Sequence, residues 1–147
     1  MSTNSTISYV HPDGKVSTRY CHADGMLEYN GAMLVEHYSD EEKIKKLMAL
    51  GYLSFLGEEP IDEPKLWDLD FSRKYTGPAC RTYRGRGDED EDGYEYNSID
   101  EYFEKMPEQE FNYIYFLGEW FWFSDYEYDE AFPPMKKVSR SLKGLAK

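Results

Sequence analysis

Alternating apolar and polar positions predict the first two strands of the chain. Residues 6–10 are rich in β-prone residue types, and residues 15–22 alternate along their length. Between them His-Pro-Asp-Gly at 11–14 is a strong turn signal, because proline suits the second position of a turn and glycine the one that needs a positive φ. We therefore expect an opening β-hairpin. Its second strand would place Val16, Thr18 and Tyr20 on one face and Ser17, Arg19 and Cys21 on the other.

Helical periodicity replaces this alternation between residues 31 and 38. The residues that fall on one side of this helix are Met33, Leu34, His37 and Tyr38. Ser39, with Glu42 three residues later, forms a capping box and predicts the start of a second helix. Gly51 fits the left-handed position that follows a helix. The buried stripe of the second helix would be Ile44, Leu47 and Met48.

The middle of the chain gives weaker signals. Residues 58–75 are predicted to be irregular, because Pro60 and Pro64 interrupt them. Residues 79–84 and 94–96 are predicted to be short strands.

A third helix and an aromatic hairpin follow. Ser98 and Glu101 form a second capping box, so we expect a helix to about residue 106 with Tyr102 and Phe103 facing inward. Residues 111–117 and 120–123 give the strongest strand signal, with a two-residue turn at positions 118 and 119. The chain therefore predicts one α+β domain over residues 1–131. Its small antiparallel sheet would combine the N-terminal hairpin with the C-terminal aromatic hairpin and pack against two or three short helices.

The composition emphasises aromatic side chains and negative charge. The 147 residues include 14 Tyr, 8 Phe and 3 Trp, and the formal net charge is -12. Tyrosines suit a binding face, since they offer large stiff contact area, but they equally suit the edge of a small core. The charge would repel nucleic acid and anionic membranes. It could instead imitate nucleic acid or attract a basic partner, or only keep the protein soluble.

The terminal residues, the two cysteines and the longest apolar run indicate the cellular compartment of the protein. Residues 132–147 contain five basic residues and no acidic one, and we expect a flexible tail there. Two cysteines, Cys21 and Cys80, do not make a disulfide framework. The first residues do not resemble a signal peptide, and the longest apolar run, 111–123, is too short for a membrane span. These features predict a cytoplasmic protein with reduced thiols.

One cluster of reactive residue types lies near the end of the first hairpin. Cys21, His22 and Asp24 are close in sequence, and His37 could approach from the following helix. A Cys–His nucleophile needs both side chains within hydrogen-bond reach, but neighbours on a strand point to opposite faces. The alternative is a buried cysteine, with the histidine and aspartate bonding the turn backbone. The spacing matches no zinc-finger pattern, and no phosphate-binding glycine motif is present, so we expect no cofactor.

An acidic run resembles the first half of a calcium-binding loop. It comprises Asp88, Glu89, Asp90, Glu91 and Asp92, followed by Gly93. Such a loop needs an acid at its twelfth position, which counted from Asp88 is Ile99. Asp88, Asp90 and Asp92 are therefore the metal-ligand candidates, and a solvated loop or partner contact is the favoured interpretation.

Several segments of the chain resemble a family of small acidic proteins encoded by bacteriophages and prophages. The resemblance lies in YCHADG at 20–25, YNG at 29–31, LVEHYS at 34–39, ALGYLSFLG at 49–57 and YRGRG at 83–87. It covers most of residues 6–122 and departs in the acidic run and in the C-terminal extension. The family has no settled activity, so it transfers no catalytic residue. It implies a phage product in the host cytoplasm that inhibits host machinery or defence, for example as an anti-CRISPR, an anti-restriction protein or a DNA mimic.

The favoured hypothesis is protein binding without catalysis. Aromatic residues would anchor a host protein with a basic surface, and the carboxylates would steer it. The expected contact residues are Asp88, Glu89, Asp90, Glu91, Asp92, Tyr94, Tyr96, Trp120, Trp122, Tyr126 and Tyr128. The alternatives are a small enzyme built on Cys21, His22 and Asp24, and a calcium-binding module at residues 88–92.

Overall fold

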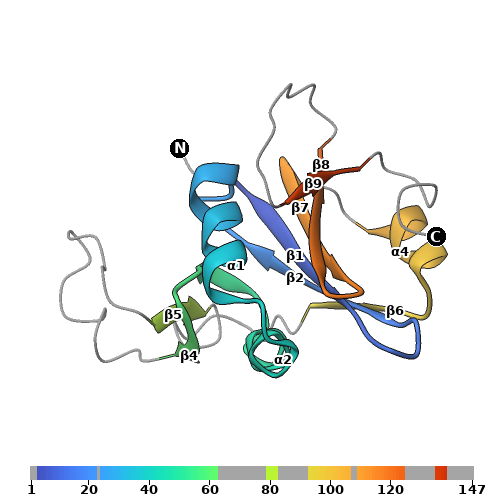
Figure 1. Cartoon of the computed structure of the whole chain (residues 1–147), viewed down its shortest axis with the longest axis horizontal. Coiled ribbons are helices and arrows are strands. Elements are labelled where there is room, and N and C mark those ends of the chain that lie inside the picture. Colours follow the sequence, from blue (N-terminus) through green and yellow to red (C-terminus); the bar gives the residue numbers. More distant parts are fainter. Residues whose placement is uncertain are drawn as a thin grey trace.

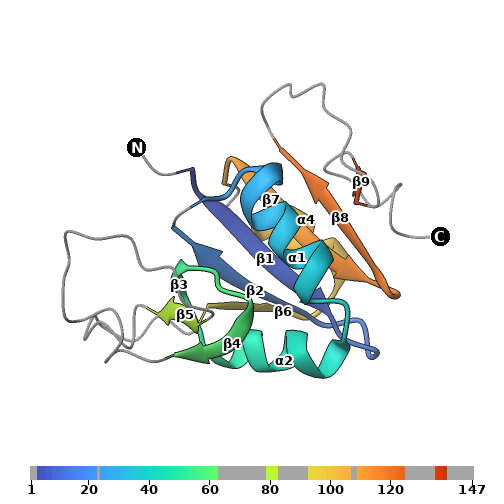
Figure 2. The same ribbon diagram turned by 60° about the vertical axis from the view of Figure 1, so that its left-hand side comes forward.

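The protein forms three layers, with helices on both faces of a central sheet (Figures 1 and 2). The computed structural model describes residues 3–22, 24–62, 79–82, 93–106, 109–124 and 135–138. Helices α1 (Ala32–His37) and α2 (Glu41–Ala49) cover one face of the sheet, and α4 (Ile99–Lys105) covers part of the other. The predicted α+β class is confirmed for the described residues.

The sheet joins the two predicted hairpins side by side. Its strands in chain order are β1 (Ser5–Val10), β2 (Val16–Cys21), β3 (Leu53–Phe55), β4 (Glu59–Asp62), β5 (Ala79–Thr82), β6 (Tyr94–Tyr96), β7 (Phe111–Phe116), β8 (Glu119–Phe123) and β9 (Lys136–Lys137). Their order across the sheet is β4-β5-β3-β2-β1-β7-β8-β9. The edge of β2 that faces away from β1 is shared: β6 pairs with its first half and β3 with its last residue, Cys21.

The sheet is mixed, so the prediction of an antiparallel sheet was wrong. Within each hairpin the strands are antiparallel, but β1 and β7, the first strands of the two hairpins, lie next to each other in parallel. The pairs β2–β3, β4–β5 and β8–β9 are parallel as well. Local alternation marks a strand and its turn, but it does not specify which strand of another hairpin lies alongside. β1 and β7 are almost wholly buried, as expected for strands covered on both faces.

The two hairpin turns follow from residues with positive φ. In the first hairpin Gly14 has a φ of +92°, which confirms the turn predicted at residues 11–14. In the second, Leu117 and Gly118 have φ values of +50° and +84°, so the turn lies one residue earlier than predicted. Phe116 pairs with Glu119, which makes Glu119 the first residue of β8. Positive φ at both central residues is the pattern of the turn that matches strand twist.

The helix caps follow the sequence closely, with one shift. Asp40, rather than Ser39, caps α2: its side chain accepts a hydrogen bond of 3.1 Å from the backbone N–H of Glu42. Gly51, with a φ of +81°, occupies the predicted left-handed position after the helix. At α4 the Ser98 hydroxyl accepts a bond of 3.1 Å from the Glu101 N–H, which confirms the second cap.

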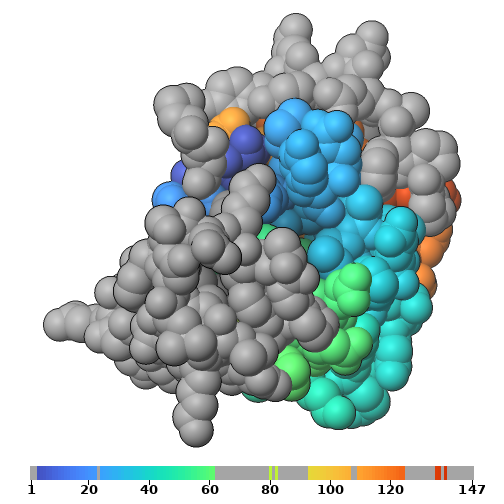
Figure 3. Space-filling model, turned by 90° about the vertical axis from the view of Figure 1, so that its left-hand side faces the viewer, coloured from blue at the N-terminus to red at the C-terminus, as the bar shows by residue number. Residues whose placement is uncertain are grey.

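The first predicted helix is longer at its start than its periodicity indicated. A π-helical turn, η1 (Leu27–Gly31), leads directly into α1. In the space-filling view of Figure 3, η1, α1 and α2 follow one another in blue to cyan along one side of the molecule, next to the green residues of β4. Gly31 lies where an added Cβ would be 3.4 Å from the Tyr113 hydroxyl, so this turn packs tightly on β7.

Two hydrophobic clusters lie on the two faces of the sheet. The larger, under α1 and α2, includes Ile7, Tyr9, Leu34, Ile44, Leu47, Tyr113, Trp120 and Trp122. The smaller, under α4, includes Val10, Val16, Tyr96, Tyr102, Phe103, Ile114, Phe121 and Phe123. Both predicted inward-facing sets on α2 and α4 are buried as expected.

Several strands were not apparent in the sequence. β3 was not predicted, and β4 lies in the segment expected to be irregular, with Pro60 inside a strand at the end of the sheet. Within the predicted tail, Met135 is buried and residues 136–137 pair with β8, so these residues belong to the sheet. Across the described part of the chain, no helix has the length and apolar character needed to cross a bilayer.

Candidate functional site

The face of the sheet that α4 partly covers changes from apolar to polar along its strands. The part under α4 is apolar, whereas the neighbouring part bears the buried hydroxyls of Thr6, Ser8 and Thr18. We call these three residues the hydroxyl floor. Their alternation in β1 and β2 places them on the same face as Val10 and Val16. The Ser8 and Thr18 hydroxyl oxygens are 2.8 Å apart and hydrogen-bonded, so the floor is internally paired.

Asn112 fixes one side of this floor. Its carboxamide oxygen accepts bonds from the Thr6 hydroxyl at 2.9 Å and from the Gln109 N–H at 3.0 Å. Its NH2 group donates to the carbonyl oxygens of Gln109 at 2.8 Å and Phe123 at 3.3 Å. All four hydrogen-bonding positions of this buried amide are therefore used. Asn112 thus joins the start of β1, the residues before β7 and the end of β8.

A cavity of about 330 Å³ lies above the hydroxyl floor. Among the described residues, its lining consists of Thr6, Thr18, Tyr20, Tyr52, Tyr94 and Gln109. The three tyrosines form a continuous group that we call the tyrosine wall. The ring centres of Tyr20 and Tyr52 are 5.7 Å apart, and those of Tyr52 and Tyr94 are 6.2 Å apart. The rings are inclined to each other by 57° and 49°, so the wall is not flat.

Three distant segments of the chain supply the tyrosine wall. Tyr20 belongs to β2, and its hydroxyl is hydrogen-bonded to Nδ1 of His22 at 2.8 Å. Tyr52 lies between the left-handed Gly51 and β3, and Tyr94 begins β6. The wall thus forms where β3 and β6 share the edge of β2. Tyr94 has 46% of its surface exposed, so the wall reaches solvent.

Side-chain contacts hold β6, and therefore Tyr94, against β2. Glu95 pairs with Arg19 at 2.7 Å and also accepts a hydrogen bond from the Ser17 hydroxyl. These contacts lie on the face opposite the tyrosine wall. Tyr96 packs edge-on against Tyr102 of α4, with ring centres 5.7 Å apart.

Gly93 permits the close approach of β6 to β2. Its φ is +111°, and an added Cβ would lie 2.5 Å from the Thr18 carbonyl oxygen and 2.6 Å from Cδ of Arg19. Backbone cannot move aside as a flexible side chain can. Glycine is therefore required here for both conformation and space.

The substitution Gly93→Ala is expected to destabilise the protein more than Gly14→Ala. Both positions have positive φ, but an added Cβ at Gly14 would meet nothing within 4 Å. The steric term at Gly93 should add about 1–3 kcal/mol to the loss in free energy of unfolding. Urea denaturation of both variants measures the difference. Equal losses would contradict the tight packing of β6 on β2.

The predicted catalytic residues occupy different surroundings. The Cys21 thiol is buried next to the Asn30 side chain, whose Nδ2 lies 3.5 Å from Sγ. His22 is exposed and bonded to Tyr20, and Asp24 is exposed with a φ of +56°. Cys21 and Tyr20 are neighbours in β2. The Cys21 thiol and the Tyr20 side chain, to which His22 is bonded, therefore lie on opposite faces of the sheet. The geometry therefore gives Cys21 the surroundings of a structural residue.

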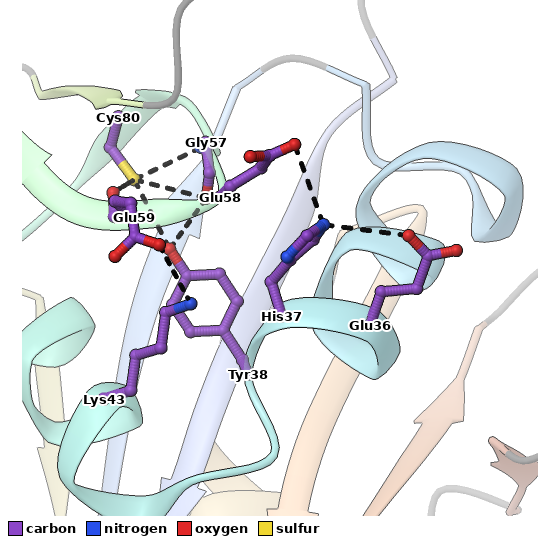
Figure 4. A network of polar contacts seen from close by, with 8 residues as sticks. All are labelled: Glu36, His37, Tyr38, Lys43, Gly57, Glu58, Glu59 and Cys80. Carbon is purple, nitrogen blue, oxygen red and sulfur yellow. Dashed lines mark hydrogen bonds and ion pairs between the residues drawn. The ribbon is translucent and has the colours of Figure 1, made fainter.

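His37 belongs to a separate network, shown in Figure 4. Its Nε2 lies 3.7 Å from a carboxylate oxygen of Glu36 and 3.7 Å from one of Glu58. His37 thus lies near two acidic side chains, on the side of the molecule where α1 meets the loop before β4 (Figure 4).

Next to His37, Tyr38 connects α1 to the loop between β3 and β4 (Figure 4). Its buried hydroxyl donates a 2.7 Å bond to the Gly57 carbonyl oxygen, and the Cys80 sulfur accepts a bond from the Gly57 N–H at 3.2 Å. The ammonium group of Lys43 lies 4.9 Å from the centre of the Tyr38 ring. Burial, followed by the nearby Cys80, raises the pKa of Tyr38 far above its usual value. These contacts indicate a structural role.

The expected partner-binding aromatic residues are mostly buried. Trp122 is fully buried, and Trp120 and Tyr96 are nearly so. The Trp120 indole N–H donates a 2.8 Å bond to the Tyr38 carbonyl oxygen and so fastens β8 to the end of α1. Of the four expected aromatic contacts that the structure describes, Tyr94 is the exposed one.

The remaining expected contacts lie outside the described residues. They are Asp88, Glu89, Asp90, Glu91, Asp92, Tyr126 and Tyr128. The proposed calcium loop therefore stays a prediction. Within the described ranges, no group of three or more His, Cys, Asp or Glu side chains is arranged to hold a metal ion.

Sequence reasoning did not identify most of the pocket. Tyr20, Tyr52 and Gln109 were not among the expected site residues, nor were Thr6 and Thr18. One signal was present: Thr18 and Tyr20 were expected to share a face of the second strand. Polar residues at alternate positions of a strand indicate a face that apolar packing does not fully cover.

Comparison of the chain with protein-family models, with curated proteins and with solved structures finds no match.

Proposed function

We propose that the protein acts by binding another protein, and that the tyrosine wall and its cavity form the centre of the contact surface. The observation that supports this most is the cavity of about 330 Å³ between three tyrosine rings and a paired hydroxyl floor. Partner-binding hot spots are typically aromatic anchors beside well-defined pockets. A rigid floor also reduces the entropy that binding must overcome.

The charge of the chain indicates the kind of partner. A formal net charge of -12 favours a target with a basic surface and disfavours direct contact with nucleic acid. The acidic run 88–92 comes just before Tyr94 in sequence. Negative charge near an aromatic anchor would increase the rate of encounter with a basic surface.

The identity of the target that we propose is a host protein of defence or of nucleic-acid handling. This choice is based on the resemblance of residues 6–122 to small acidic phage proteins, together with the acidity of the chain. An inhibitor of such a target would occupy the basic surface that normally receives nucleic acid. The buried Cys21 thiol gives the enzymatic alternative less support than the pocket gives to binding.

A photo-reactive amino acid at position 94 should cross-link the partner. Tyr94 is replaced by p-benzoylphenylalanine, the full-length protein is produced in a bacterial host, and the cells are irradiated. We expect a discrete cross-linked species at this position, because Tyr94 combines exposure with a place on the tyrosine wall. Mass spectrometry of the purified species then identifies the partner and the residue that was captured.

The control places the same amino acid at Leu117. Leu117 is 76% exposed but lies in the turn between β7 and β8, outside the cavity lining. A species that forms at position 94 and not at 117 supports the proposed contact surface. The same species from both positions, or from neither, would contradict it.

A further inference from the structure

We infer that the cavity receives an arginine side chain of the partner protein, whose guanidinium group would lie among the rings of Tyr20, Tyr52 and Tyr94. This inference builds on the proposed function and names the chemistry of the group that the pocket recognises. It is drawn from ring geometry, from the hydrogen-bonding state of the floor and from charge.

The tyrosine wall brings three aromatic rings to one cavity. Adjacent rings are separated by 5.7 Å and 6.2 Å and inclined by 57° and 49°, so their faces do not stack closely on one another. The face of an aromatic ring carries the negative part of its quadrupole and attracts a cation within about 6 Å. Inclined rings around a cavity can present more than one such face to the same group.

One polar group of the lining, the Thr6 hydroxyl, can only accept a further hydrogen bond. The single hydroxyl hydrogen of Thr6 is donated to the Asn112 oxygen, so any further bond that this hydroxyl makes must be one that it accepts. A guanidinium group has five donors and no acceptor, so it complements such an oxygen. A carboxylate or phosphate would instead place its lone pairs against those of Thr6.

The net charge of the chain favours the same occupant, and the described lining contains no charged side chain. Arg19, on the same strand as Tyr20, points to the opposite face and is paired with Glu95, so it does not place its charge in the cavity. His22 binds the Tyr20 hydroxyl through Nδ1. The chain as a whole is strongly acidic. Arginine suits the site better than lysine, because its planar group stacks on aromatic faces and is less strongly hydrated.

A matched pair of peptides tests this inference. The probes are acetyl-Gly-Arg-Gly-amide and acetyl-Gly-citrulline-Gly-amide, which differ in charge and hardly in shape. Each is titrated into the full-length protein with isotope-labelled tyrosine rings, and ring chemical shifts are followed by NMR. We expect the arginine peptide to shift the signals of Tyr20, Tyr52 and Tyr94, and the citrulline peptide to bind roughly fivefold or more weakly.

Two leucine variants assign the effect to the pocket. Tyr94→Leu keeps apolar bulk but removes one ring face, and should weaken the arginine peptide roughly threefold or more. Tyr29→Leu is the control, since Tyr29 is 56% exposed and is not part of the described lining. Equal binding of both peptides, or equal effects of the two variants, would overturn the inference.

The two proposals fail in different ways. A partner cross-linked at position 94, together with no preference for arginine over citrulline, would overturn the arginine inference and leave the proposed function standing. Arginine preference without any cross-linked protein at position 94 would contradict the proposed function, and with it the assignment of the arginine to a partner protein.

Discussion

Replacing Trp122 with alanine is expected to lower the free energy of unfolding by about 3–5 kcal/mol, which is the usual range for removing a large buried aromatic side chain. Trp122 has no exposed surface and lies under α1 and α2, with its ring centre 5.7 Å from that of Phe111. Its neighbours belong to the most deeply buried part of the sheet and can close the resulting space only in part. Urea denaturation, followed by far-UV circular dichroism, measures the loss.

Leu117→Ala provides the control for this experiment. Leu117 is a large apolar residue in the neighbouring turn, but it is exposed. A surface change of this kind usually alters stability by less than about 0.5 kcal/mol. A Trp122→Ala protein that stays nearly as stable as Leu117→Ala would contradict the buried position of Trp122. It would also restore the earlier expectation that this tryptophan contacts a partner.

Raising the pH above 10 is expected to destabilise the fold steeply. Burial raises the pKa of Tyr9 and of Tyr96 to about 12, and it raises those of Tyr38 and Tyr115 as well. In the unfolded chain these phenols ionise near pH 10, whereas in the native state they keep their protons. The unfolded state then binds fewer protons. The stability that these tyrosines contribute is therefore fully present below pH 10 and is lost as the pH rises toward their folded values.

Each such tyrosine should reduce stability by up to about 1.4 kcal/mol per pH unit above pH 10. Tyr38→Phe removes one of them, so the fall in stability between pH 10 and 11.5 should become shallower by about that amount. At pH 7 the same variant should be less stable by about 1–3 kcal/mol, because the buried Gly57 carbonyl oxygen loses the Tyr38 hydroxyl.

Urea denaturation at several pH values between 7 and 11.5 measures both effects. Tyr29→Phe, at an exposed position, controls for the loss of a hydroxyl at pH 7 and should be nearly neutral there. If the stability of Tyr38→Phe fell with pH as steeply as that of the unchanged protein, Tyr38 would not be a protonated buried phenol.

Most of the helices and hairpins were predicted from the sequence, because caps and turns depend on residues that are close together in the chain. The cap at Ser98 and the left-handed Gly14 and Gly51 each depend on residues within a few positions. The shift from Ser39 to Asp40 shows the limit of such signals. Both residue types cap helices well, and the structure selects the one with the extended backbone, φ of -98° and ψ of 124°, from which its side chain reaches the Glu42 N–H.

Part of the expected binding face was misplaced because Trp120 and Trp122 were assigned to the surface although they lie in the longest apolar run of the chain. Trp120 and Trp122 point into the larger core cluster, and Phe121 and Phe123 between and after them point into the smaller one. β8 is thus covered on both faces. Its almost continuous aromatic sequence is the pattern of a buried strand. Interpreted in that way, the sequence predicts that both tryptophans are buried.

The pocket itself required information that local patterns lack. Tyr20, Tyr52 and Tyr94 come together only because β3 and β6 pair with the same edge of β2. One of these pairings is parallel and the other antiparallel. No spacing along the sequence encodes a meeting of three segments, so the site had to be found in three dimensions.

The shared edge of β2 also has a consequence for the order of folding. The first hairpin can form from residues 5–21 alone, but the tyrosine wall needs β3 and β6 to arrive from more than thirty and more than seventy positions away. Closing such long loops is slow, because chain entropy must be lost before the contacts form. During synthesis the proposed binding surface therefore cannot form until Gln109, which also lines the cavity, has left the ribosome. The proposed partner could therefore bind only after most of the chain has been made.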